Sequence, residues 1–325
     1  MYVIKYPLFL EIKFIFLTIF LKMEKGQINS LDFYKDGRYL VTSCEDNMLR
    51  VYDVMNGNEK QVLNSKKHGL DVVKFTHHEK NVICASKNEW DETIRYWSLY
   101  DNNYLRYFKG HRKGVVALCM SPSNDSFLSA SLDQTVRLWD LRSASTQGLI
   151  RPILGDSPRI AFDYQKELIF AITTENKIKL FDFRKYDKGP FSTFEVNYPS
   201  APFKWSSMEF SKDGKYLICS TDTSTIFVID SFEGNIVNIF NDRENNSSQM
   251  INASCSPDSK FVFSGSENGK VYIWPIDQNY THKPIAVFKE HSNVVKNVLF
   301  NPTNFMMASS CSSLAFWIPN YLEKK

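Results

Sequence analysis

One unit recurs seven times along this chain and constrains the fold more than any other feature of the sequence. Each copy contains a short apolar run, a turn, a second apolar run, another turn and a third run that ends near a large apolar residue. The last apolar residue of the first run recurs at intervals of 42 to 48 positions, and in five copies the large residue follows it 19 positions later. Three short strands per copy at a fixed period predict one repetitive all-β architecture and leave no length for a second domain. The first-run residues are Phe33, Phe75, Met120, Phe162, Phe210, Cys255 and Phe300, and the third-run residues are Tyr52, Trp97, Trp139, Phe181, Ile229, Trp274 and Trp317.

The copy from residue 110 to residue 140 is the most complete of the seven. It begins with Gly110-His111 and ends with Trp139-Asp140, and these paired ends resemble the signature of WD40 repeats. The sequence therefore predicts an all-β, seven-bladed WD40 β-propeller over residues 17–322. Because such a ring has to be closed, we expect residues 17–21 to form an N-terminal strand that completes the last blade.

The first 16 residues form an apolar extension whose role the sequence does not define. Lys5, Glu11 and Lys13 interrupt it, so no uncharged span is long enough for a membrane helix, and we expect no contact with a membrane. Residues 14–21 could instead serve as the apolar core of a secretory signal, although no small-residue cleavage site follows them. We favour the closure strand over the signal.

Composition narrows the classes of partner. The chain has 39 basic and 36 acidic residues and a net charge of +3, whereas nucleic-acid binders normally carry a strongly basic domain. Partners are therefore expected to be proteins, with no sequence-specific contact to nucleic acid. The six cysteines lack the spacing of metal ligands, and no phosphate-binding loop is present. We expect no metal, no cofactor, and cysteines buried in the core of a protein from a reducing compartment.

Four residues of the third copy allow two interpretations. His111, Ser129 and Asp133 supply the residue types of a hydrolase triad. In WD40 blades the same positions, together with Trp139, form a buried hydrogen-bonded chain that satisfies polar groups in the core. Other copies carry only fragments of the set, which suits a stabilising device better than an active site. We therefore predict a structural role and no enzymatic activity.

Binding residues are predicted on the upper face of the ring, where the loops before each first strand and between the second and third strands emerge together. An enlarged loop carries Trp90, and an aromatic, proline-containing loop carries Tyr198 and Phe203. Each aromatic residue is either an interface anchor or a side chain folded onto its own loop. Basic residues of the upper loops form either a rim for an acidic or phosphorylated peptide or scattered solvated charge. These basic residues are Lys66, Lys67, Arg112, Lys113 and Arg159.

Several stretches resemble the WD-repeat protein 82 family more closely than a WD40 repeat requires. Residues 187–191, Asp-Lys-Gly-Pro-Phe, and residues 315–319, Ala-Phe-Trp-Ile-Pro, are the most specific. The chain departs from the family pattern in its apolar N-terminal extension, in an extra residue near Trp90, and at Trp97, where the family commonly has an aliphatic residue. The other resembling segments are residues 67–71, 76–77, 91–96, 104–111, 138–143, 147–149 and 193–194.

The resemblance implies a nuclear, non-catalytic adaptor. Members of this family are subunits of COMPASS-type histone H3 lysine-4 methyltransferase complexes, in which the partners are the catalytic subunit and the phosphorylated C-terminal repeats of RNA polymerase II. Members also belong to assemblies with protein phosphatase 1 and to the mRNA cleavage and polyadenylation machinery. Two alternatives stay open at this point: an adaptor used mainly in transcription termination and 3′-end processing, and an enzyme or secreted protein.

Overall fold

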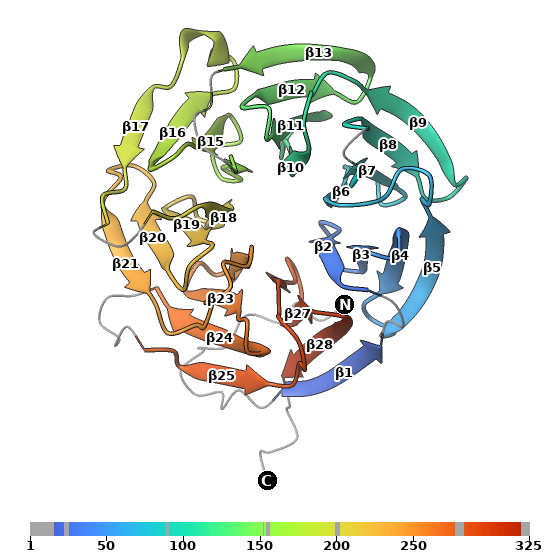
Figure 1. Cartoon of the computed structure of the whole chain (residues 1–325), viewed down its shortest axis with the longest axis vertical. Helices are drawn as coiled ribbons and strands as arrows, with labels where there is room; N and C mark the ends of the chain where they lie inside the picture. The colour runs from blue at the N-terminus through green and yellow to red at the C-terminus, as the bar shows by residue number, and fades with distance from the viewer. Residues whose placement is uncertain are drawn as a thin grey trace.

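Seven four-stranded antiparallel sheets surround a central axis like the blades of a propeller (Figure 1). This computed structural model describes residues 16–22, 26–88, 91–151, 153, 157–198, 202–276 and 283–319, with the side chains of 16–22 and 319 excepted. Besides strands, the described residues contain one turn of 3₁₀-helix, η1 (Tyr186–Lys188). The predicted fold class, an all-β WD40 propeller of seven blades, is confirmed.

Each blade takes its strands in chain order from the axis outward, except the last. Blade 1 comprises β2 (Ile28–Phe33), β3 (Tyr39–Cys44), β4 (Met48–Asp53) and β5 (Asn58–Asn64). Blade 2 comprises β6 (Val73–Phe75), β7 (Asn81–Ala85), β8 (Ile94–Ser98) and β9 (Asn103–Phe108). Blade 3 comprises β10 (Val115–Met120), β11 (Ser126–Ser131), β12 (Val136–Asp140) and β13 (Ser143–Ile150). Blades 4 and 5 comprise β14 (Ile160–Phe162), β15 (Ile169–Thr173), β16 (Lys177–Asp182), β17 (Ser192–Glu195); β18 (Trp205–Phe210), β19 (Tyr216–Thr221), β20 (Ile226–Asp230), β21 (Ile236–Phe240). Blades 6 and 7 comprise β22 (Ala253–Cys255), β23 (Phe261–Gly265), β24 (Lys270–Pro275), β25 (Ala286–Lys289); β26 (Asn297–Phe300), β27 (Met307–Ser310), β28 (Ser313–Pro319) and β1 (Phe16–Lys22).

The repeated spacing of the marker residues is a strand register. In blade 3, Met120 lies opposite Phe127, and Phe127 lies opposite Trp139. The same three-residue row recurs in the other six blades, for example from Phe33 through Leu40 to Tyr52 in blade 1. A slip of one residue would turn every buried side chain of a strand toward the other face, so the fixed spacing preserves the core of each blade.

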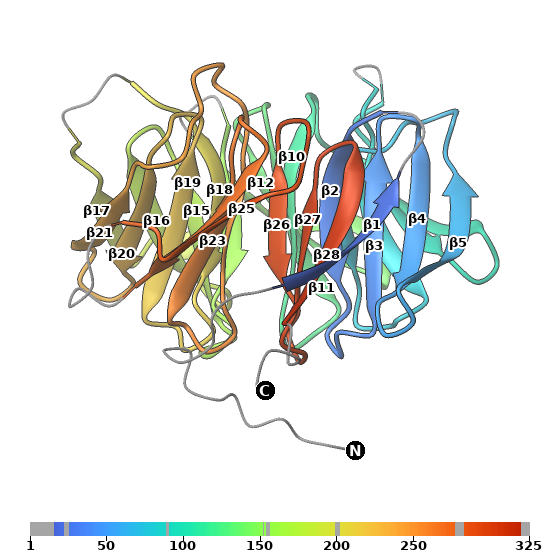
Figure 2. The same ribbon diagram turned by 90° about the horizontal axis from the view of Figure 1, so that it is seen from below.

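The ring is closed by β1, the first described segment of the chain, which pairs with β28, the last. The two strands run antiparallel from Phe16 opposite Pro319 to Lys22 opposite Ser313, and β1 lies along the outside of blade 7 (Figure 2). The strand thus extends one residue beyond each end of the predicted 17–21. Residues 1–15 of the predicted extension lie outside the described part of the chain. The predicted division into an extension of residues 1–16 and a propeller of residues 17–322 therefore stays a prediction.

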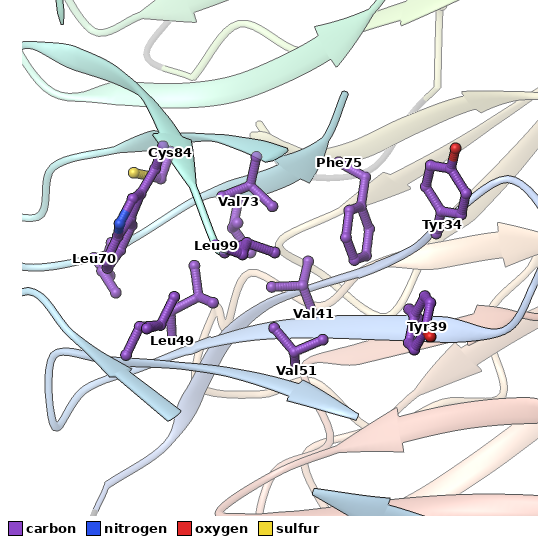
Figure 3. Packing of buried hydrophobic residues seen from close by; sticks show 13 residues of the cluster. Tyr34, Tyr39, Val41, Leu49, Val51, Leu70, Val73, Phe75, Cys84 and Leu99 are labelled. Atoms are coloured by element: carbon purple, nitrogen blue, oxygen red, sulfur yellow. The ribbon is translucent and has the colours of Figure 1, made fainter. Parts of the chain in front are cut away.

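Hydrophobic clusters fill the spaces between neighbouring blades. Between blades 1 and 2, Val41 and Val51 of one sheet lie near Val73 and Phe75 of the next (Figure 3). Phe75 also meets Tyr34 edge-on, with ring centroids 5.5 Å apart. All six cysteines are free thiols, and five of them are buried. Burial of apolar surface between blades stabilises the ring only while each blade keeps both of its neighbours.

Removing β1 is expected to destabilise the whole propeller. A chain lacking residues 1–22 leaves the edge of β28 unpaired, and we expect its unfolding temperature to fall by at least about 10 °C and its transition to broaden. A chain lacking only residues 1–15 keeps every pairing of β1 and is the matched control. Equal unfolding temperatures for the two deletions, measured by circular dichroism, would show that closure by β1 contributes little.

Candidate functional site

A chain of hydrogen bonds crosses the interior of blade 3. The Trp139 indole nitrogen donates to Ser129 Oγ over 2.8 Å, and Ser129 Oγ lies 2.7 Å from His111 Nε2. The other nitrogen of the same imidazole, His111 Nδ1, lies 3.0 Å from Asp133 Oδ2. Strands β11 and β12 supply Ser129 and Trp139, while His111 and Asp133 come from two adjacent upper loops. All four residues selected from the sequence therefore meet in one set.

The chemistry of this set indicates a stabilising role. A carboxylate only accepts hydrogen bonds, so the N–H at His111 Nδ1 donates to Asp133, which leaves Nε2 to accept from the Ser129 hydroxyl. Burial lowers the pKa of His111 despite the opposing effect of Asp133, so the imidazole is neutral at neutral pH. Ser129 and Trp139 are both 0% exposed. We infer that this serine satisfies buried polar groups, because a substrate has no path to its hydroxyl.

Blade 7 repeats the set with one substitution. His291 Nε2 lies 2.6 Å from Ser309 Oγ, which also accepts the Trp317 indole N–H over 2.7 Å. Where blade 3 uses an aspartate, His291 Nδ1 faces the sulfur of Cys311 at 3.1 Å. Blades 3 and 7 thus share the Trp–Ser–His part of the chain and differ only in the group that faces His Nδ1, Asp133 in one and Cys311 in the other.

Blade 2 holds only part of the set. His68 Nδ1 lies 2.8 Å from Asp91 Oδ2, but Cys84 stands at the position that Ser129 occupies in blade 3. Because a thiol is a weak acceptor, the indole N–H of Trp97 has no hydrogen-bond partner among the described residues. The fragment that the sequence indicated is therefore present without its central link.

Sequence reasoning missed Arg243, which takes the place of a histidine in blade 6. Its side chain is 1% exposed and donates to Ser264 Oγ over 2.8 Å and to the carbonyl oxygens of Thr221 and Thr223 over 2.7 and 2.9 Å. Burial lowers its pKa to about 9, which keeps the guanidinium charged at neutral pH. Its place in the sequence could have indicated this role, because Arg243 lies in the loop before the first strand of its blade, β22. Blades 3 and 7 carry their histidines, His111 and His291, in the corresponding loops. This arginine ties blade 5 to blade 6.

Asp133 of the hydrogen-bonded set and the nearby Ser131 fix the backbone that carries two rim cations, Arg112 and Lys113. The backbone N–H of Arg112 donates to Asp133 Oδ2 over 2.9 Å, and the Ser131 hydroxyl donates to the Lys113 carbonyl over 2.7 Å. These bonds hold the loop before β10 against the turn between β11 and β12, while the side chains of Arg112 and Lys113 are exposed. Lys66 and Lys67 are also exposed, in the corresponding loop of neighbouring blade 2. Within the described part of the chain, none of these four side chains forms an ion pair.

Arg159 does not belong to this rim, contrary to the prediction. Its guanidinium donates to the carbonyl oxygen of Val116 in blade 3 over 2.6 Å and to that of Trp205 in blade 5 over 3.2 Å. Val116 lies at a bulge of β10, which leaves its carbonyl free to accept. Burial lowers the pKa of Arg159 to about 10. The residue braces three adjacent blades, with its Nε and Nη1 donors both used inside the ring.

The predicted aromatic anchors Tyr198 and Phe203 pack onto their own blade. The rings of Tyr198 and Phe203 lie 5.4 and 5.6 Å from that of Phe227, and Phe203 also meets Trp205 edge-on at 4.9 Å. Both residues are half-buried members of the cluster between blades 4 and 5. This packing uses the apolar surface that an interface anchor would offer. The third predicted anchor, Trp90, lies outside the described residues.

The described residues contain no group of three or more histidine, cysteine, aspartate and glutamate side chains arranged to hold a metal ion. They also contain no helix with the length and apolar character needed to cross a membrane. On the upper face, two neighbouring loops present four exposed cationic side chains, those of Lys66, Lys67, Arg112 and Lys113. That surface suits recognition of an anionic partner.

Comparison with known proteins agrees with the repeat architecture. The model of the WD domain, G-beta repeat, matches residues 17–53, 102–140 and 244–275. WD repeat-containing protein 82 of Drosophila melanogaster is 44% identical over 91% of this chain and 92% of its own length. Set1 complex component swd2 of Schizosaccharomyces pombe is 32% identical over 90% of this chain and 92% of its own. COMPASS component SWD2 of Saccharomyces cerevisiae is 30% identical over 94% and 96%.

The neutral state of His111 predicts a pH-dependent stability. Its pKa in the folded chain lies below the usual 6.5, so the unfolded chain takes up the proton first as the pH falls through that value. We expect stability to be lost from about pH 7 downward, until the pH reaches the pKa of the folded state. The His111→Gln variant is expected to be less stable at neutral pH and to lose less on acidification. Thermal unfolding between about pH 8 and pH 5 measures both, and parallel pH profiles would contradict this role of His111.

Proposed function

Since the chain belongs to the WD repeat-containing protein 82 family, we propose that it is a non-catalytic scaffold subunit of a nuclear, COMPASS-type histone H3 lysine-4 methyltransferase complex. The observation that carries this proposal is similarity along the whole ring. Two relatives named as components of the Set1 complex and of COMPASS align over 90% and 94% of this chain. Family membership itself confirms the resemblance predicted from the sequence.

The geometry supports a scaffold better than an enzyme. The triad-like residues of blade 3 are buried and hydrogen-bonded to one another, with Ser129 0% exposed. The upper loops, in contrast, hold exposed side chains on a backbone fixed by Asp133 and Ser131. Rigid blades with exposed loops are suited to holding several proteins in a fixed relation.

The rim cations support a finer proposal, that the scaffold links its complex to the phosphorylated C-terminal repeats of RNA polymerase II. A phosphate group carries close to two negative charges and three acceptor oxygens. Arg112 can offer two parallel donors to such a group, and Lys113, Lys66 and Lys67 add positive charge around it. Two neighbouring loops therefore provide enough cations for one phosphorylated residue and its flanking sequence.

Affinity purification of the tagged chain from nuclei tests the scaffold role. We expect a histone methyltransferase catalytic subunit among the proteins recovered in near-equal amounts and identified by mass spectrometry. The chain lacking residues 1–22 is the control for dependence on a closed ring. Recovery of cleavage and polyadenylation or phosphatase subunits without any methyltransferase would contradict the proposal and favour an adaptor of transcription termination.

Reversing the charge of the rim tests the link to the polymerase. The double variant Arg112→Glu, Lys113→Glu is expected to bind a phosphorylated C-terminal repeat peptide at least about tenfold more weakly, because two attractive charges become repulsive. Binding is measured by fluorescence anisotropy with a labelled peptide, at fixed salt concentration.

The matched control is Lys215→Glu, Lys260→Glu, which changes the net charge equally at two exposed turns of the opposite face. Both double variants should unfold at the temperature of the unaltered chain. Unchanged affinity in the rim variant, or an equal loss in the control, would exclude this rim as the phosphopeptide site.

A further inference from the structure

A hollow of about 560 Å³ lies on the lower face of blade 4, opposite the rim. It is enclosed by the turn between β14 and β15 on one side and by the loop between β16 and β17, which contains η1, on the other. That loop includes residues 187–191, a segment that a WD40 blade does not require. The lining consists of Lys166, Leu168, Ile169, Asp182, Arg184, Lys185, Lys188, Gly189, Pro190 and Phe191.

Positive charge dominates this hollow. Its lining holds four cationic side chains and one carboxylate, that of Asp182. Arg184 uses its guanidinium on Asp182, with Nε and Nη2 lying 3.2 and 3.0 Å from the two carboxylate oxygens. Lys185 and Lys188 are exposed and form no ion pair with any described residue. The hollow thus keeps unneutralised ammonium groups that attract negative charge.

Apolar surface lies beside the lysines. Phe191 is 58% exposed, although it is a large hydrophobic residue. Pro190 next to it is exposed, and Leu168 and Ile169 on the facing turn are only partly buried. Exposed aromatic side chains at the edge of a depression are favoured anchors for a partner's apolar side chain.

The loop that carries Phe191 is already fixed in the free protein. The Tyr186 hydroxyl donates to the Gln147 carbonyl over 3.0 Å, and the Tyr186 ring lies against Gly148, where an added Cβ would come within 2.6 Å of it. The Phe191 N–H donates to the Leu180 carbonyl over 2.9 Å. A preformed loop lowers the entropy that a partner has to give up on binding.

We propose that this hollow docks an acidic peptide segment of a partner protein, with a bulky apolar side chain against Phe191 and aspartate or glutamate residues beside Lys185 and Lys188. The guanidinium fork that best recognises phosphate is occupied by Asp182, and the free lysines are separate point charges, which suits carboxylates spread along a peptide. The lining has a single aromatic ring, whereas single-stranded nucleic acids are held by several stacked bases. The hollow lies opposite the rim, so a partner bound in it leaves the rim free for a second partner. Binding of a peptide in the hollow does not depend on the complex proposed above.

The test is a titration of a labelled synthetic peptide, with a Phe-Leu pair between two runs of Asp and Glu, against the full chain. Two variants probe the two halves of the hollow. Lys185→Glu, Lys188→Glu should weaken binding at least about tenfold by repulsion, and Phe191→Ala at least about fivefold through the lost anchor. Phe191 is largely exposed, so its truncation should leave the unfolding temperature unchanged.

Lys215→Glu, Lys260→Glu is again the matched control, because it changes the net charge equally at exposed turns of the same lower face. We expect its affinity for the peptide to stay within about twofold of that of the unaltered chain. The proposal is overturned by an equal loss in this control, or by full affinity in Phe191→Ala. It is also overturned if a single-stranded oligonucleotide or a phosphoserine peptide binds this hollow more tightly, or if sedimentation shows a dimer that the Lys185, Lys188 reversal abolishes.

Discussion

The pairing of β1 with β28 is the constraint on which the rest of the structure depends. Every other described blade is built from four consecutive strands, and each buries its flanks against two neighbours. Blade 7 alone needs the two ends of the described chain to meet, over seven paired positions from Phe16 to Lys22. Without that pairing, blade 7 exposes a strand edge and the ring loses its continuity. Local contacts within blades can form early, but the closed ring requires the most distant contact in the chain.

Rigidity inside the blades passes directly to the surfaces that contact partners. In blade 3 the buried Trp139–Ser129–His111 chain ends at Asp133, whose Oδ2 also accepts from the backbone N–H of Arg112. A core network therefore determines where a rim cation stands. On the opposite face, Tyr186 packed on Gly148 does the same for the loop of Phe191. Both surfaces are exposed side chains on a backbone that the fold holds still.

The fold could be predicted from the sequence because the spacing of apolar residues along the chain reflects the register of the strands. The row from Met120 through Phe127 to Trp139 is one example. The hydrogen-bonded set could be selected for the same reason. The rim was harder, since a sequence shows that Arg159 is basic but does not show that a bulge carbonyl at Val116 will take its donors. The basic hollow could not be predicted at all, because Lys166 and Lys188 come from two separate loops that meet only in the folded blade.

Amide hydrogen exchange measured by mass spectrometry tests the central role of ring closure most directly. If β1 and β28 hold the ring together, their amides should exchange only with global unfolding, at the same rate as those of the inner strands of the other blades. The loops of the rim and of the hollow should exchange faster, without opening of the strands beneath them. Early exchange of β1, while the remaining blades stay protected, would show that the ring persists without its closing strand and would contradict this account.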